Sequence, residues 1–266
     1  MPRPSPRLVL ALSTLLGTAA GLAVGGPVRT AAAPDAHGRA VAAGDIAKLA
    51  TPLADLEATI RVTKYDSAEL EKIGSDFKTT YSLRTLTLQY KQPDKIRLEG
   101  HSQTRGGAVL IMNGAMRFYE VPKLKLKKTE NLEAHPGKRQ SLLEYAGLIS
   151  QGTLQFMDAT LLRQEKAGDR AAQVYELRFQ GEEKSSFYRV WLDNQTHVTV
   201  KREWYGSDGK LRATFLYDDA REIAPGTWLP TKVEVKNADG LVAAELSVSE
   251  IKPNQGLTDA PFTVAR

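Results

Sequence analysis

Apolar and polar residues alternate one for one through most of this sequence. The stretch LTLQYKQPDKIRLEG, residues 86–100, alternates, breaks at a polar Pro-Asp pair and alternates again. A period of two puts successive side chains on opposite faces of a β-strand, so this stretch predicts two half-buried strands around a tight turn. Similar patterns cover residues 56–66, 78–90, 108–120, 122–130, 171–179, 186–194, 197–205, 210–219, 227–237 and 241–251. We therefore predict a mainly β protein, an antiparallel meander of about eleven strands.

Turn residues separate these strands, and one segment departs from the pattern. Asn113-Gly114 predicts a tight hairpin, and Gly occurs in the connections at 207–210, 224–226 and 237–240. Between residues 137 and 165, apolar residues recur at helical spacing, and Ser141 with Glu144 resembles a capping box. We expect two short helices there, separated by Gly147 and Gly152, the first of them unusually apolar.

The first residues have the composition of a secretory signal peptide. Arg3 and Arg7 precede an apolar run from Leu8 to Val24, which is followed by small residues. We assign residues 1–33 to a signal peptide cleaved between 25 and 36; the alternative, an uncleaved membrane helix, would need a longer run of about 20 residues.

After the signal peptide, we expect residues 34–50 to form a loose leader and residues 51–266 to form a single domain. The chain has no cysteine, hence no disulfide and no lipobox, and we expect a soluble periplasmic or secreted protein.

The sequence offers little catalytic chemistry. Its four histidines stand singly, without a partner at metal-ligand spacing, and no G-x-S-x-G or phosphate-binding motif is present. Adjacent acids such as Asp218-Asp219 and Glu182-Glu183 are typical of solvated turns. Glycosidase acids come from distant positions in a sequence, so the sequence alone leaves that chemistry open. We expect no enzyme, no catalytic residue, no metal and no cofactor. The net charge of +5 arises from 36 basic and 31 acidic residues, so nucleic acid is not an expected partner.

Two groups of side chains have alternative interpretations. Lys123, Lys125, Lys127 and Lys128 form either the solvated face of a strand or a docking site for an acidic partner. Aromatic residues on predicted strands either form ordinary core or line a ligand cavity; they are Phe118, Phe187, Trp191, Trp204, Phe215 and Trp228.

The segment QPDKIRLEG, followed by LIMNGAMRFYEVP, resembles the periplasmic lipoprotein carriers of the LolA type. The C-terminal WLPTKVEVKN and ELSVSEIKPNQGLTDAPFTV are similar to the wider lipoprotein-sorting family, and the likeness extends over about residues 55–264. It implies a strongly curved antiparallel sheet, an open half-barrel, capped by a short helical lid around an apolar cavity that holds acyl chains. One departure is clear: the carriers have arginine before the proline that corresponds to Pro93, whereas this chain has Gln92.

From these patterns we expect a soluble, monomeric carrier of acylated lipoproteins or other lipids, which exchanges cargo with membrane-bound donor or acceptor proteins. The alternative is an envelope sensor or adaptor that binds a membrane protein through the four lysines. Ile149, Leu142 and Leu143 are the lid candidates. The candidate cavity residues are Leu86, Leu88, Ile96, Leu98, Phe118, Trp191, Trp204 and Phe215.

Overall fold

The computed structural model describes residues 38–102, 106–135, 145–182 and 184–264. These contain fourteen strands in one antiparallel sheet, against the eleven or so predicted. The strands are β1 Arg39–Ala40, β2 Asp55–Tyr65, β3 Thr85–Lys91, β4 Lys95–Ser102, β5 Gly106–Asn113, β6 Met116–Val121, β7 Leu126–Asn131, β8 Met157–Ala167, β9 Arg170–Phe179, β10 Phe187–Asp193, β11 Thr199–Tyr205, β12 Leu211–Ala224, β13 Thr227–Asn237 and β14 Val242–Pro253.

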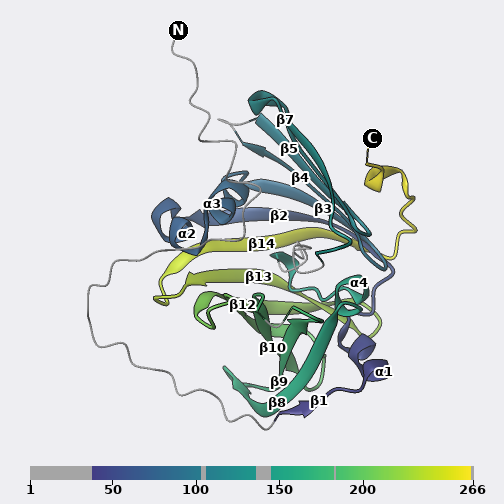
Figure 1. The fold of residues 1–266 in the computed structure, drawn as a ribbon, viewed down its shortest axis with the longest axis vertical. Helices are drawn as coiled ribbons and strands as arrows, with labels where there is room; N and C mark the ends of the chain where they lie inside the picture. The colour runs from purple at the N-terminus through teal and green to yellow at the C-terminus, as the bar shows by residue number, and fades with distance from the viewer. Residues whose placement is uncertain (1–37, 103–105, 136–144, 183, 265–266) are drawn as a thin grey trace.

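The sheet consists of two consecutive meanders that join at the first long strand and the last. Its order is β1-β8-β9-β10-β11-β12-β13-β14-β2-β3-β4-β5-β6-β7. Strand β14 pairs with β2, so that Val248 lies opposite Ile60 although the two are far apart in sequence. Strands β1 and β7 form the free edges, and the sheet is strongly curved without closing into a barrel (Figure 1). The predicted mainly β, open half-barrel fold is confirmed.

The alternating residues place one apolar set on a single face, here called the inner face. On β3, for example, Leu86, Leu88 and Tyr90 are buried, while Thr85 and Thr87 are exposed. Leu88 lies between Ala58 on β2 and Leu98 on β4. Buried apolar side chains continue in this way from β8 through β14 to β5 and form the main hydrophobic cluster.

Short helices and one extended segment cover the inner face. Helices α2 (Ser67–Ile73) and α3 (Ser75–Tyr81) lie near one end of the strands, and α1 (Ala43–Ile46) and α4 (Gln151–Leu154) lie near the other (Figure 1). Residues 145–150, which precede α4, are all buried. The remaining short elements are 3-10 turns at Ala47–Leu49, Pro122–Leu124 and Ala260–Phe262.

Three parts of the predicted secondary structure were wrong. Residues 78–81 belong to helix α3, and the strand begins only at Thr85. Residues 157–165 form strand β8 rather than a helix, because the register shift between Leu161 and Arg163 interrupts the alternation that would have revealed a strand. Residues Pro122–Leu124 form a 3-10 turn, and left-handed Lys125 separates it from β7.

The expected helical segment is also shorter than predicted. Gly152 lies within the four-residue helix α4 rather than separating two helices. Residues 39–49, part of the predicted leader, contain β1, α1 and a 3-10 turn.

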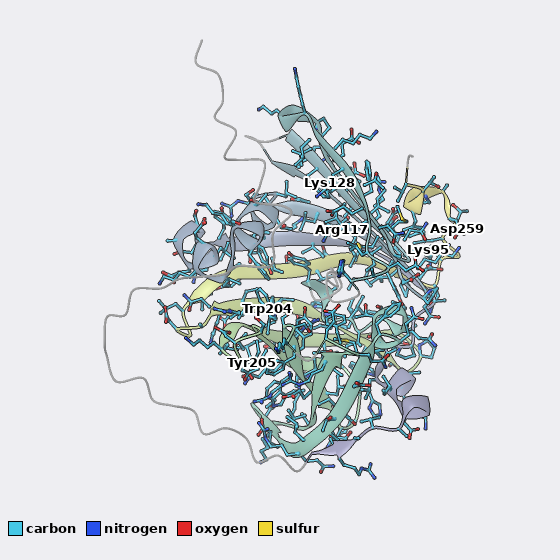
Figure 2. The ribbon with its side chains drawn as sticks, in the orientation of Figure 1. Lys95, Arg117, Lys128, Trp204, Tyr205 and Asp259 are labelled. Carbon is cyan, nitrogen blue, oxygen red and sulfur yellow. The ribbon has the colours of Figure 1, made fainter. Side chains whose placement is uncertain are left out.

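The C-terminal residues pack on the opposite, outer face of β5 and β6. Phe262 is fully buried against Ile111 and Phe118. Asp259 bridges Lys91 and Lys95 at 2.7 Å each (Figure 2), and its hydrogen bonds with these lysines lower its pKa to about 2. The tail therefore combines one apolar anchor with an exposed ion-pair group.

Candidate functional site

Six of the eight candidate cavity residues lie together on the inner face. Ile149, a lid candidate, belongs to the same cluster; the six are Leu86, Leu88, Ile96, Leu98, Trp204 and Phe215. Trp191 and Phe118 instead lie on the outer face, in two separate small clusters. Lid candidates Leu142 and Leu143 lie outside the described residues. Alternation located the strands, but it could not tell which face of β6 and β10 would join the main cluster.

Five aromatic side chains meet where α3, residues 145–150 and strands β11–β12 come together. Phe77 of α3 stacks on Trp204 of β11 with ring centroids 5.6 Å apart, and it lies 6.2 Å from the ring of Phe215. Tyr81 lies 6.1 Å from Phe77 and 5.2 Å from Tyr145. Helices α2 and α3 and residues 145–150 are together called the cover, and these aromatic rings connect the cover to the sheet. This region, shown around Trp204 in Figure 2, is the centre of the candidate site.

Two nitrogen-bearing side chains of β11 point to this mainly apolar face. Arg202 is 7% exposed, and its guanidinium lies 4.0 Å from the ring centroid of Tyr188. Trp204 is 8% exposed, and its Nε1 is buried without a hydrogen-bond acceptor among the described residues. A buried indole N–H usually finds a partner, so that of Trp204 requires an explanation.

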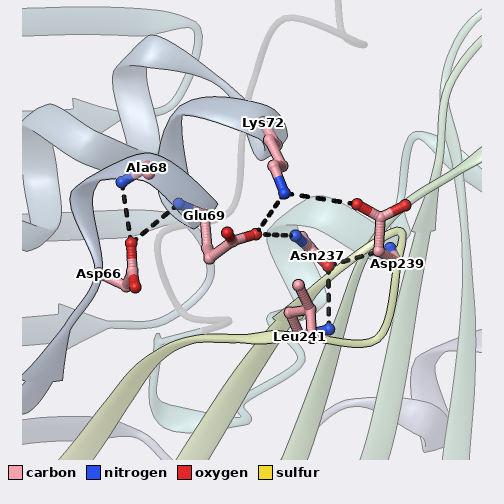
Figure 3. A network of polar contacts seen from close by, with 7 residues as sticks. All are labelled: Asp66, Ala68, Glu69, Lys72, Asn237, Asp239 and Leu241. Atoms are coloured by element: carbon pink, nitrogen blue, oxygen red, sulfur yellow. Dashed lines mark hydrogen bonds and ion pairs between the residues drawn. The ribbon is translucent and has the colours of Figure 1, made fainter.

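Helix α2 is tied to the β13–β14 hairpin by a polar network (Figure 3). The Asp66 carboxylate caps α2 by accepting from the backbone N–H groups of Ala68 and Glu69. Asn237 donates to the Glu69 carboxylate at 2.5 Å, and Lys72 bridges Glu69 and Asp239 at 2.8 and 3.6 Å. In contrast, α3 begins at Gly74 without a side-chain cap. Helix α3 is held instead by the Tyr65 hydroxyl, which donates to the Lys78 carbonyl at 3.3 Å, and by the Lys78–Glu71 ion pair at 2.8 Å.

The segment from Tyr145 to α4 is attached to the residues before β2 and to the β3–β4 turn. Thr51 N–H donates to the carbonyl of Ile149, and Ile149 N–H donates to the Thr51 hydroxyl. Gly152 N–H donates to the carbonyl of Pro93, at 2.8 Å. A Cβ on Gly152 would come within 2.5 Å of that carbonyl oxygen, so only glycine allows this approach.

A pocket of about 460 Å³ opens where the N-terminal elements meet the other end of the inner face. Its apolar wall includes Leu161, Tyr175 and Leu192 of β8–β10, which also border the main cluster. Its charged residues include Arg39, Lys48 and Asp45, and the last two form an exposed ion pair at 2.6 Å. The pocket lies within the usual size range of small-ligand sites, about 300–1,000 Å³.

The four candidate docking lysines lie at one edge of the sheet. Lys123, Lys125 and Lys127 are exposed on or beside β7. Lys128 is half-buried and pairs with Glu130 at 2.5 Å (Figure 2). Burial raises the pKa of Glu130, but hydrogen bonds from Lys128 and Arg117 outweigh burial and hold that pKa below its usual value. An edge strand rich in lysine also discourages edge-to-edge aggregation, so both interpretations of this run remain open.

The sequence reasoning missed the α2–α3 cover, although a signal for it existed. Asp66 and Glu69 have the spacing of an N-terminal capping pair, and Leu70, Ile73 and Phe77 recur at three- and four-residue intervals. In the structure Leu70 and Ile73 are buried in the main cluster, and Phe77 packs against it.

Neither a cluster of metal ligands nor a membrane-spanning helix occurs in the part of the chain that the structure describes. Within it, no group of three or more His, Asp or Glu residues could hold a metal ion. Within the same ranges, no helix is long and apolar enough to cross a membrane.

Comparison with solved structures places the fold. A LolA superfamily protein from Nitrosomonas europaea is 21% identical, with a TM-score of 0.56 over 84% of this chain and 98% of that chain. A putative outer membrane lipoprotein-sorting protein domain from Vibrio parahaemolyticus is 13% identical, with a TM-score of 0.56 over 83% and 94%. A DUF1329 family protein from Desulfovibrio piger is 12% identical, with a TM-score of 0.55 over the same shares.

Sequence comparison adds the family. No curated protein matches the sequence. A family model described as an uncharacterized protein matches residues 125–266, more than half of the chain. The chain therefore belongs to this family of uncharacterized proteins, and its fold is LolA-like.

Proposed function

We propose that this protein is an extracytoplasmic carrier that binds acyl chains, in particular those of lipoproteins, on the inner face of its sheet and moves them between membranes. One observation carries the proposal. The apolar cluster of the inner face extends from β8 to β5, and short helices and a single segment cover it rather than a second sheet.

The energetics of such a site are favourable. Burying an acyl chain contributes about 0.8 kcal/mol per methylene, so a few buried methylenes give useful affinity. When cargo replaces the rings of Phe77 and Tyr81 on the sheet, one apolar contact is exchanged for another. Little apolar surface of the sheet is then exposed to water, and the main cost is the movement of a seven-residue helix.

The proposal is tested by native mass spectrometry of the protein purified gently from its own cell envelope. We expect a stoichiometric lipid or acylated peptide, and after delipidation we expect uptake of a triacylated lipopeptide at micromolar concentration. An apo mass together with no uptake would overturn the carrier proposal, and the inner face would then be ordinary core.

The site within the fold is tested with matched variants of two apolar residues. Phe77→Asp places a charge in the aromatic contact between α3 and β11 and should weaken lipopeptide binding at least tenfold. Leu241→Asp is the control, because Leu241 is 51% exposed on the neighbouring hairpin and should bind like the wild type. Equal binding by both variants would remove the α3 region from the site.

The exposed lysines beside β7 favour a second candidate, an adaptor that docks an acidic membrane-protein partner. The double variant Lys125→Ala/Lys127→Ala should then abolish salt-sensitive capture of that partner. Lys232→Ala, which changes a lysine 67% exposed on β13, is the control. If the double variant still captures the partner, the lysines beside β7 are not the docking site.

A further inference from the structure

Trp204 carries a buried indole donor on the inner face that the fold leaves unused. Trp204 is 8% exposed, and its Nε1–H lacks an acceptor among the described residues. The two other tryptophans lie elsewhere. Trp191, on the outer face, donates to the Glu165 carboxylate at 2.5 Å, and Trp228 packs beside the same outer cluster. A buried, unsatisfied N–H is costly, and a phenylalanine at position 204 would avoid that cost.

The surroundings of Trp204 are mainly apolar and lie under α3, with the Arg202 guanidinium close by on the ring of Tyr188. Its cross-strand neighbours are Tyr188 on β10 and Ala213 on β12. Phe77 of α3 stacks on its ring, and α3 has no side-chain cap. Movement of α3 would uncover Trp204, so cargo that replaces Phe77 would meet this N–H within a mainly apolar wall that also carries Arg202.

We propose that the Trp204 N–H donates a hydrogen bond to the carbonyl oxygen of the cargo's acyl linkage, so that the site selects acyl lipids over alkyl ethers. This inference rests on the proposed function. The hydrocarbon tails of the cargo contain no hydrogen-bond acceptor, whereas the ester or amide that joins each tail to the rest of the cargo has one carbonyl. In an apolar environment that carbonyl also needs a donor, so the two unsatisfied groups complement each other.

The test compares a diester glycerolipid with its diether analogue, which has the same chains and headgroup and lacks only the carbonyls. We expect the wild-type protein to prefer the diester about three- to tenfold, the range of one net hydrogen bond. Trp204→Phe should remove this preference. Because any loss of packing in the variant weakens both ligands alike, the ratio of the two affinities reports the N–H alone. Trp191→Phe is the control and should retain the wild-type ratio.

An independent readout uses the indole signals in an NMR spectrum, since the chain has three tryptophans. The diester should shift the Trp204 N–H signal downfield, and the diether should not. If both lipids bind wild-type protein equally, or if Trp204→Phe keeps the preference, the inference is overturned while the carrier proposal stands. If neither lipid binds, the carrier proposal fails and the inference fails with it.

Discussion

Asp55 shows how one side chain fixes the position of a distant segment. It is 4% exposed on the first long strand, and its carboxylate accepts three backbone N–H groups of the C-terminal tail. Gln255 donates at 2.7 Å, Gly256 at 2.9 Å and Leu257 at 3.2 Å. This clamp directs the chain after β14 onto the outer face of β4–β6, where Phe262 is buried.

Asp55→Asn should lower the free energy of unfolding by about 1–3 kcal/mol, because the amide NH₂ would face donors that then lack an acceptor. Urea unfolding checks this as a lower midpoint with an unchanged slope. Asp259→Asn is the control: Asp259 is 63% exposed and holds the same tail only through surface ion pairs, so it should change the midpoint far less. Equal midpoints for both variants would contradict the clamp.

Two glycines at the ends of the cover differ in the space around them. A Cβ on Gly152 would meet the Pro93 carbonyl oxygen at 2.5 Å and the Cβ of Asp94 at 2.3 Å, whereas one on Gly74 would meet only Phe77, at 3.8 Å. Gly152→Ala should therefore cost about 1–3 kcal/mol, as overpacking does, and Gly74→Ala should not destabilise the protein. Thermal unfolding of the two variants measures the difference, and equal stability would mean that α4 moves away from Pro93 freely.

At the level of elements, the sequence predicted strands better than it predicted what covers them. A period of two survives in almost every strand, because each buries one face. It failed in β8, where a register shift lies between Leu161 and Arg163, and Leu162 packs with the outer cluster while Leu161 borders the inner one. The helices α2 and α3 are seven residues each, too short for their periodicity to dominate a run containing Thr79, Thr80 and Tyr81.

We expect the cap of α2 to control how readily α2 and α3 move away from the inner face. Asp66→Ala removes the acceptor of two backbone N–H groups and should destabilise the α2–α3 unit by about 0.5–2 kcal/mol. Hydrogen exchange should become faster in residues 67–81, and lipopeptide should bind faster.

Ser150→Ala is the matched control for the cap of α4, since Ser150 accepts from Thr153 N–H. It should leave exchange in residues 67–81 unchanged. Uniformly faster exchange throughout the sheet in Asp66→Ala would show that the cap stabilises the whole fold and not the cover alone.

At the scale of the molecule, the pairing of β14 with β2 could not have been predicted from local pattern. Within each meander the long strands pair with their neighbours in sequence, most of them through short turns and β2 with β3 across the α2–α3 segment. The β14–β2 pair instead depends on burying Val248, Leu246 and Ile60 in the same cluster. The family resemblance predicted an apolar cavity, but strand parity could not place Phe118 and Trp191, because both faces of the sheet carry buried apolar groups.

Because the inner-face cluster joins both meanders, cargo bound there should stabilise the sheet as one unit. At a free lipopeptide concentration of 100 times Kd, linkage gives about 2.7 kcal/mol, which for a domain of this size raises Tm by about 5–10 °C. Calorimetry with and without lipopeptide measures the shift, and a single transition should move as a whole. Two separate transitions, only one of them shifted, would mean that the cargo contacts one meander and that the inner face is not a continuous site.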